Sequence, residues 1–597
     1  MPLFNRTDLE VSVLTSNIKS GSLGLPDLQR PFVWPDTKVR DLVKSMIKGY
    51  PIGFVILWTQ PGVDKSRLIG TSGHAYSNPN ELIIDGQQRL TSLYSLITGS
   101  PVKDNTFKDK RIVLSYNPST EAVEVAGEAF KKSPDWIYDL TTVFMSDNLY
   151  DLSKAFVDRK VESLEKAGTV LSESEKGSMI GDLMSKLSVF KGKILNYQVP
   201  ILTINKEAEE EDVADIFVNI NSGGTSLNQS DFILTLVSVH YPEGRTMIEE
   251  FSKNTRIHNQ DPKKDLCNPI FFFEPSDIIR VVMAYGFKRG RLKYAYKLLR
   301  GADFEKKGAI SEELRNSRFD AFKLHLGNVL DANNFKEFLK CVNAAGFVKS
   351  NLLNSANNIV YAYAFWLIGK YDFGLDVNSL KKVISKAVYF FNLTSRYSGS
   401  FEGLAENELL ELDELAKSGN KDSFSQYFEN LERTILTNDY FNITLVERLK
   451  SSSNKNPEFL AYIAAQNILD AKVLFSRPQI STVTLYNDWI SGTRNAVELH
   501  HLFPKQYLKN NGYKFKEINQ VGNYAFIEWT DNMDISDDAP SIYFKREIAG
   551  MSEAEVKDML RLHAIPFGWE DLDYQVFLSE RRKLMAAVIR EGYEKLS

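Results

Sequence analysis

A change in the pattern of apolar residues near residue 208 constrains the fold of this chain more than any other feature. Before it, short apolar runs bounded by glycine, proline or asparagine alternate with segments of helical spacing. From about Ala208 to Leu449 the pattern becomes almost wholly helical. A chain of 597 residues is also too long for one hydrophobic core. The sequence therefore predicts an α+β protein of several domains.

Residues 1–240 have the pattern of a mixed α/β domain. The predicted strands are PIGFVILW from Pro51, ELIIDG from Glu81, RIVLSY from Arg111 and VPILTI from Val199. The segments TKVRDLVKSMIKG and QQRLTSLYSLITG place apolar residues at helical spacing. A charged stretch from Lys154 to Lys193 is predicted to form helices that are an insertion or an outer layer.

Two further domains are expected after residue 240. Residues 241–455 form the helical domain, and SSSNKNP, from Ser451, has the composition of a linker. Residues 456–597 form a last module with short strand-like pieces near VELHHLF and NYAFIEW, closed by a charged helical tail.

Composition narrows the classes of protein to consider. The formal net charge is -5, which argues against tight nonspecific coating of DNA but leaves room for a local basic surface. Only two cysteines occur, far apart, which excludes a disulfide scaffold and a thiolate zinc site. The N-terminus has no apolar signal segment, and no run of 18 apolar residues occurs. We expect a cytoplasmic protein with no membrane partner.

The segment LIIDGQQRLTSLYSLITG predicts a strand, a glycine turn and the start of a helix. A helix N-terminus offers unpaired N–H groups that suit phosphate, and Gly86 permits close approach to the backbone. Arg89 can donate two hydrogen bonds to phosphate oxygens, and Asp85 can hold a metal or a ribose hydroxyl. An ordinary turn, in which Asp85 caps the helix and Arg89 is solvated, explains the same residues.

Two other segments accompany this motif, QRPFVWP with Gln29 and Arg30, and NINSGG with Asn219 and Asn221. In this order the three segments resemble the ParB/sulfiredoxin-like domain with a DGQQR motif of GmrSD-type, modification-dependent (type IV) restriction enzymes. The resemblance implies binding, and hydrolysis, of a nucleoside triphosphate such as GTP. The chain has no GxxxxGK[ST] segment, so the site would not be a P-loop. The implied nucleotide-binding residues are Gln29, Arg30, Asp85, Gly86, Gln87, Gln88, Arg89, Asn219 and Asn221.

A second constellation lies near the C-terminus. His500 and His501 end a strand-like run in VELHHLFPK, and Asn523, Asn532 and Lys545 follow. Hydrolysis of a phosphodiester needs an activated water and a cation on the phosphate. A neutral imidazole can take the proton of the water near pH 7. The other five histidines stand singly and are expected at the surface or in the core.

The C-terminal segment resembles the HNH nuclease module of GmrSD-type enzymes, which has a ββα-metal core. The resemblance implies that His501 is the general base and that Asn523 orients it. It also implies that His500 and Asn532 bind a divalent ion, Mg²⁺ or Mn²⁺. Neighbouring strand residues face opposite sides, so His500 and His501 can cooperate only if the strand bends, as Pro504 permits. A metal-free surface pair of histidines is the alternative.

Two basic segments could contact DNA. Lys505, Lys509, Lys514 and Lys516 lie between the histidine pair and Asn523. Lys505 and Lys545 are the predicted phosphate contacts. FKRGRLKYAYKLLRG, from Phe287, carries six cations, but we favour a helix face that packs against acidic parts of the chain.

Together these features predict a nucleotide-regulated, metal-dependent endonuclease that cuts modified phage DNA. Cutting both strands with one site per chain favours a homodimer or successive nicks. A nucleotide-binding sensor whose HNH-like part only binds DNA or a partner is the alternative. An NTPase or nickase within a larger defence complex is a third interpretation.

Overall fold

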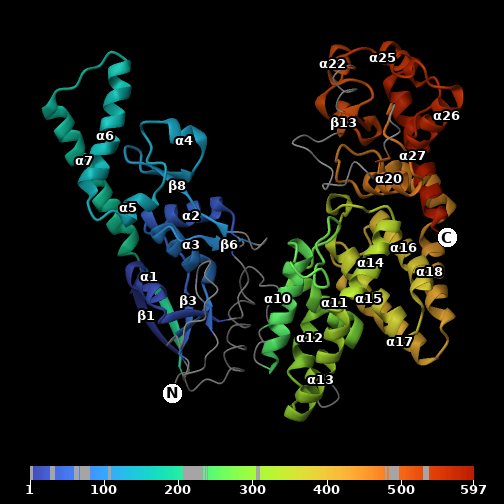
Figure 1. Cartoon of the computed structure of the whole chain (residues 1–597), viewed down its shortest axis with the longest axis horizontal. Coiled ribbons are helices and arrows are strands. Elements are labelled where there is room, and N and C mark those ends of the chain that lie inside the picture. The colour runs from blue at the N-terminus through green and yellow to red at the C-terminus, as the bar shows by residue number, and fades with distance from the viewer. Residues whose placement is uncertain are drawn as a thin grey trace. The chain divides into compact units, whose positions relative to one another are not determined.

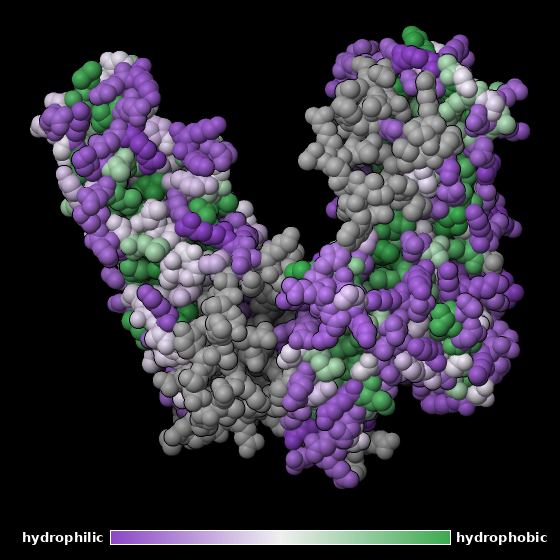
Figure 2. Space-filling view, in the orientation of Figure 1, coloured by the Kyte–Doolittle hydropathy of each residue, from purple (hydrophilic) through white to green (hydrophobic). Residues whose placement is uncertain are grey.

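In the computed structural model of this protein, the contacts group the chain into two units, Met1–Val239 and His240–Ser597. The structure describes residues 4–26, 32, 34–59, 66–67, 81–104, 109–205, 233–234, 237, 240–303, 309–476, 481–482, 497–528, 535 and 537–596. Within these ranges, no helix combines the length and the apolar character needed to cross a membrane. In the view of Figure 2, most of the coloured surface of each unit is hydrophilic.

The first unit mixes helices with short strands (Figure 1). Its strands are β1 (Phe4–Glu10), β2 (Leu23–Pro26), β3 (Val55–Thr59), β4 (Ser66–Arg67), β5 (Glu81–Asp85), β6 (Val102–Lys103), β7 (Asp109–Lys110), β8 (Leu114–Asn117), β9 (Ala122–Val125) and β10 (Gln198–Ile204). Its helices are α1 (Val11–Ser20), α2 (Asp36–Ile47), α3 (Gln87–Thr98), α4 (Glu128–Lys132), α5 (Thr141–Met145), α6 (Leu149–Lys166) and α7 (Glu173–Leu195). The mixed α/β character expected of this region is confirmed.

A six-stranded sheet in the order β1-β10-β3-β5-β2-β4 forms the centre of this unit. It is mixed, because β10 and β3 run parallel whereas β3 and β5 run antiparallel. Val55, Leu57 and Ile83 face a core shared with α1, α2 and α3. Ile56 and Ile84 belong to a second cluster on the other face. Because both faces of these strands are buried, their sequences are continuous runs of apolar residues.

The charged stretch from Lys154 to Lys193 falls in α6 and α7, which pack side by side as expected (Figure 1). One side of each helix is buried and joins the core cluster, through Phe156 and Val161 on α6 and Leu187 and Phe190 on α7. The opposite sides are exposed to solvent, which explains their charge.

The second unit is mainly helical up to residue 468 and adds a small sheet after it. Its first part contains α10 (Pro242–Arg256), α11 (Pro275–Phe287), α12 (Leu292–Leu299), β11 (Ala302–Asp303), β12 (Ala309–Ile310), α13 (Glu312–Val329), α14 (Ala332–Ala344), η1 (Ser350–Leu352), α15 (Ala356–Tyr371), α16 (Val377–Thr394), α17 (Glu402–Lys417), α18 (Asp422–Ile435), η2 (Tyr440–Thr444), α19 (Leu445–Arg448) and α20 (Pro457–Ile468). Its last part contains β13 (Val497–His501), α22 (Lys505–Asn510), α23 (Phe515–Ile518), η4 (Val521–Asn523), β14 (Tyr524–Glu528), α25 (Pro540–Glu547), α26 (Glu553–Leu562), η5 (Trp569–Asp571) and α27 (Tyr574–Lys595).

Helix α15 lies at the centre of the helical part. All residues from 358 to 369 are buried, because the helix packs against α11, α14 and α16 (Figure 1). A helix that is apolar on every side has to be surrounded by other elements, as here.

The helical part and the C-terminal part share one contact unit, because α20 packs against both α16 and α27. The predicted linker forms a turn in which Asn456 caps α20 by accepting a hydrogen bond from the Phe459 N–H, 2.9 Å long. The contacts therefore do not divide residues 241–455 from residues 456–597, and the boundary between these two domains stays a prediction.

Candidate functional site

The DGQQR segment forms the predicted strand, turn and helix. β5 ends at Asp85, Gly86 adopts a left-handed conformation with φ 93°, and α3 begins at Gln87. The N-cap of α3 is Gly86, and the Asp85 carboxylate accepts a hydrogen bond from Arg89. Gln87 and Gln88 are half-buried. Gln29, Arg30, Asn219 and Asn221 lie outside the described residues.

The Arg89 guanidinium has two internal partners. It donates to the Ile52 carbonyl at 2.7 Å and to the Asp85 carboxylate at 3.2 Å. Burial lowers the pKa of Arg89, and the Asp85 charge opposes that shift. The solvated Arg89 of the ordinary-turn alternative is therefore not observed. A phosphate at this turn would have to share Arg89 with Asp85.

Two glycines make this arrangement sterically feasible. A Cβ on Gly86 would lie 2.8 Å from Val55 Cγ2, and a Cβ on Gly53, φ 90°, would lie 2.4 Å from Arg89 Nη1. Left-handed φ values strain other residues, and these contacts leave no room for a side chain.

Gly86→Ala is accordingly expected to lower the stability of the first unit by about 2 kcal/mol. Gly127→Ala is the control, since Gly127 has an extended φ of -154° and a Cβ there would meet nothing within 4 Å. Chemical denaturation of both variants measures the difference. Equal midpoints for the two variants would contradict the steric argument.

The C-terminal candidate site is built on a two-stranded sheet followed by a helix. β13 and β14 pair antiparallel, with His500 opposite Ala525 and His501 opposite Tyr524. Tyr543 of α25 donates from its hydroxyl to the Leu502 carbonyl at 2.6 Å, which holds the helix against the end of β13. The two strand-like pieces of the sequence are therefore strands.

His501 is half-buried at the end of β13. Its Nε2 lies 2.9 Å from Asn519 Oδ1, and its ring packs edge-on against Tyr524 with centroids 5.0 Å apart. Asn519 donates from Nδ2 to the Phe515 carbonyl at 2.9 Å, which fixes the orientation of its amide. Because Oδ1 can only accept, His501 Nε2 carries the hydrogen, and the Nδ1 lone pair is left to take a proton.

His501 is uncharged at neutral pH. Burial lowers the pKa of His501 to about 4, the Lys505 charge adds to the shift, and the Asn519 hydrogen bond opposes it. The imidazole is therefore neutral near pH 7, as proton acceptance from water requires.

Asn523 does not contact His501 in the way the resemblance implied. It is fully buried, and its Oδ1 accepts from the Phe503 N–H at 2.8 Å. Its Nδ2 donates to the carbonyls of Phe503 and Ile518. Asn523 thus holds the backbone that follows β13, while Asn519 orients His501. Both are asparagines within INQVGN, so no signal in the sequence separated their roles.

His500 faces the opposite side of β13. It is 5% exposed, and its ring packs against Tyr543 with centroids 6.1 Å apart. The ladder to β14 continues through both histidines, so the bend expected near Pro504 does not bring them to one face.

The described residues contain no group of three or more His, Cys, Asp or Glu side chains placed to hold a metal ion. Asn532, the second predicted ligand, lies outside them. One imidazole, that of His500, therefore does not complete a divalent-ion site, which needs further oxygen ligands.

The family match found for this chain lies within the first unit. Residues 11–238 match the family of the GmrSD restriction endonuclease, N-terminal domain. The match covers less than half of the chain. An uncharacterized protein of Methanocaldococcus jannaschii is 26% identical over 582 residues, covering 92% of this chain and 90% of that protein. No solved structure matches the chain.

The basic segment from Phe287 lies outside the residues of the GmrSD match. It packs against acidic side chains, which is the arrangement favoured from the sequence. Arg289 pairs with Glu406 at 2.9 Å, and Lys288 pairs with Asp372 at 2.7 Å. The same Glu406 carboxylate accepts the Gly290 N–H at 2.6 Å. The start of this segment is thus engaged within the unit.

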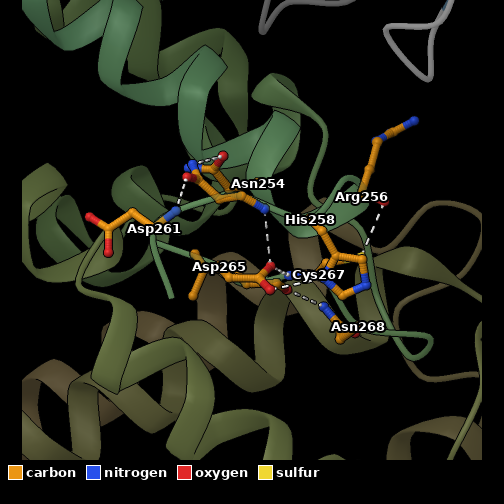
Figure 3. Close-up of polar contacts among 9 residues, drawn as sticks. Asn254, Arg256, His258, Asp261, Asp265, Cys267 and Asn268 are labelled. Carbon is orange, nitrogen blue, oxygen red and sulfur yellow. Dashed lines mark hydrogen bonds and ion pairs between the residues drawn. The ribbon is translucent and has the colours of Figure 1, made fainter. Parts of the chain in front are cut away.

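A turn after α10 groups His258, Asp265 and Cys267 (Figure 3). His258 Nδ1 lies 2.9 Å from Asp265 Oδ2, and the hydrogen bond lowers the pKa of Asp265. Burial raises the pKa of Cys267, whose thiol donates to the Arg256 carbonyl at 3.3 Å. A protonated, internally bonded thiol is a poor nucleophile, so this cluster stabilises a turn.

His563 is a core histidine, as expected for one that stands singly. Its Nε2 lies 2.7 Å from the Lys472 carbonyl and donates to it, so Nδ1 accepts from Gln466 Nε2 at 3.3 Å. Burial lowers the pKa of His563 to about 4, so the native ring stays neutral.

The unfolded chain binds the proton of His563 near pH 6.5, whereas the native chain resists it down to about pH 4. Native stability should therefore fall as the pH drops through this window, by up to about 3 kcal/mol from this group. His563→Gln keeps one donor and one acceptor but does not titrate. Urea denaturation of both proteins should show their stability difference shrinking from pH 7 to pH 4. A constant difference would exclude His563 as the titrating group.

Proposed function

We propose that this chain is a DNA endonuclease that restricts modified foreign DNA, such as modified phage DNA. Residues 456–597 would hydrolyse the phosphodiester, and residues 1–240 would bind a nucleotide that regulates cutting. The match of residues 11–238 to the GmrSD restriction endonuclease N-terminal domain supports the restriction class.

The observation that carries the nuclease part is the arrangement of His501. Its imidazole is neutral at pH 7, and the hydrogen bond to Asn519 leaves Nδ1 as the proton-accepting atom. In the proposed reaction, Nδ1 takes the proton of the attacking water. Tyr524 packs against the ring and restricts its rotation.

The substrate would be held by exposed lysines of the C-terminal part. Lys505 opens α22, and its charge acts on the pKa of His501. Lys545 is exposed in the last turn of α25. We propose that both contact phosphates, since their exposed ammonium groups attract the DNA backbone.

We propose that His500 and Asn532 bind a divalent cation, Mg²⁺ or Mn²⁺. His500 faces the side of β13 opposite to His501, so an ion bound there would supply positive charge to the phosphate that faces His501 only if β13 bends. An imidazole ligand favours Mn²⁺ over strict Mg²⁺ dependence, because Mg²⁺ prefers oxygen ligands.

The proposed nucleotide site is the turn at Gly86, and GTP is the proposed ligand. The helix α3 begins directly after the left-handed Gly86, which carries no side chain to block a phosphate at the helix N-terminus. Gln87 and Gln88 begin the helix, and Gln29, Arg30, Asn219 and Asn221 are proposed to complete the site. Two chains would associate as a homodimer to cut both strands.

The test is a cleavage assay of plain and modified duplex DNA with Mg²⁺ or Mn²⁺, with and without GTP. Metal-dependent cutting of modified DNA that responds to GTP is the expected result. Absence of cutting on every substrate would overturn the nuclease proposal. If the chain binds nucleotide but cuts no DNA, the alternative of a nucleotide-binding sensor would apply, and the first unit would carry its function.

A further inference from the structure

An aromatic side chain stands out on the surface of the C-terminal part. Phe515, the first residue of α23, is 76% exposed, and it lies between the exposed residues Lys514 and Lys516. Leaving a phenylalanine in water forgoes the favourable free energy of its burial. Single exposed apolar residues are common, so the surroundings of Phe515 decide whether it has a partner.

The backbone around Phe515 is firmly held. Ile518, the last residue of α23, is buried, and the Tyr574 hydroxyl donates to the carbonyls of Glu517 and Ile518. The Phe515 carbonyl accepts both the N–H and the Nδ2 of Asn519. The ring is therefore presented on a fixed turn, which lowers the entropy cost of binding a partner through it.

The charge around Phe515 is mainly positive. Four exposed lysines, which we call the lysine surface, lie next to Phe515 in sequence or on the neighbouring helix α22: Lys505, Lys509, Lys514 and Lys516. Within the described residues none of the four forms an ion pair, unlike Lys583 and Lys417, which pair with acids on their own helices. The nearest acid in sequence, Glu517, accepts the Lys514 N–H at 2.8 Å and caps α23. Free cations beside an exposed ring match a polyanion with flat apolar groups, which is a nucleic acid.

Phe515 and His501 are linked through a shared hydrogen-bond partner. One side chain, Asn519, bonds to both the Phe515 carbonyl and the His501 ring. A base step that received the Phe515 ring would thus place its neighbouring phosphates near the proposed base.

We propose that Phe515 is a wedge that inserts between adjacent base pairs of duplex DNA bound on the lysine surface. The inserted ring sets the position of the backbone so that a phosphodiester faces His501. This inference rests on the proposed function, because it takes DNA as the substrate.

The chain supplies a matched control in Phe567. This ring is 90% exposed in the same unit, but it lies between Pro566 and Gly568 and is followed by Glu570 and Asp571. Because no basic surface accompanies the exposed ring of Phe567, we expect that ring to make no contact with DNA.

The test uses the full chain, in EDTA to prevent cutting, with a duplex that carries 2-aminopurine. Binding of the wild type should raise 2-aminopurine fluorescence, because an inserted ring unstacks the base. Phe515→Ala should lose this signal and weaken binding about 10-fold to 100-fold with an unchanged salt dependence. Phe515→Trp should keep both, and Phe567→Ala should behave as wild type. Lys516→Ala should weaken binding and reduce the salt dependence.

Three results would overturn the inference. If Phe515→Ala binds as tightly as wild type while Lys516→Ala binds weakly, DNA lies on the lysine surface without insertion, and the proposed function stands. The same holds if wild-type binding leaves the fluorescence unchanged. If wild type binds no duplex, the inference falls together with the proposed function.

Discussion

Replacing His501 with alanine is expected to reduce DNA cleavage about 1,000-fold, with unchanged affinity for DNA. The substitution removes the neutral imidazole that the proposal uses as proton acceptor, whereas the lysines proposed to bind phosphate remain. Initial rates on a labelled duplex that wild type cuts, with binding measured in EDTA, separate the two effects. Cleavage by His501→Ala at the wild-type rate would show that another group activates the water.

Variants of Asn519 test the orientation of the His501 ring separately from its presence. Asn519→Ala should slow cleavage about 10-fold to 100-fold, because Nε2 loses the acceptor that fixes the tautomer. Asn519→Asp keeps an acceptor and adds a negative charge, which raises the pKa of His501. The acid limb of the pH–rate profile should therefore move to higher pH in Asn519→Asp. If both variants keep the wild-type rate and profile, the assigned proton-accepting atom is wrong.

Replacing Arg581 with methionine is expected to destabilise the C-terminal part by about 3–5 kcal/mol. Arg581 lies on α27, is fully buried, and donates to the carbonyls of Gly522 at 2.9 Å and Tyr524 at 2.8 Å. It also donates to the His563 carbonyl at 3.3 Å. Methionine fills much of the volume but leaves three buried carbonyls without these donors. Arg581 thereby ties α27 to the backbone on both sides of Asn523.

Hydrogen exchange of the β13 and β14 amides in increasing urea measures this loss where it occurs. Lys583→Ala is the control on the same helix, since Lys583 is exposed and pairs with Glu580 at 2.8 Å. That pair should contribute less than about 1 kcal/mol. Exchange in Arg581→Met as slow as in Lys583→Ala would mean that water replaces the lost hydrogen bonds.

Much of the secondary structure could be predicted, because it follows from local spacing. The apolar runs at Val55 and Ile83 became β3 and β5, and QQRLTSLYSLIT became α3. The turn at Gly86 was also predictable, since few residues other than glycine adopt a left-handed φ. The partners of Arg89 were not, because Ile52 lies 37 residues away along the chain.

The residue types of the C-terminal site were visible in the sequence, and so was the strand that carries His500 and His501. Which asparagine orients His501 was not visible. That depends on the turn between α23 and β14, which aims Asn519 at the imidazole and buries Asn523 against the Phe503 backbone. Side-chain direction at such a turn is set by packing from α25 and α27, which lie later in the chain.

The amino-acid sequence alone therefore established the α+β class and the strand–turn–helix at Gly86. It also gave the positions of the residues whose side chains can accept a proton or contact a phosphate. These follow from periodicity and backbone sterics, which act between near neighbours. The roles of Asn519, Asn523 and Arg581 emerged only from the folded chain. They depend on contacts between distant segments, whose geometry no local pattern contains.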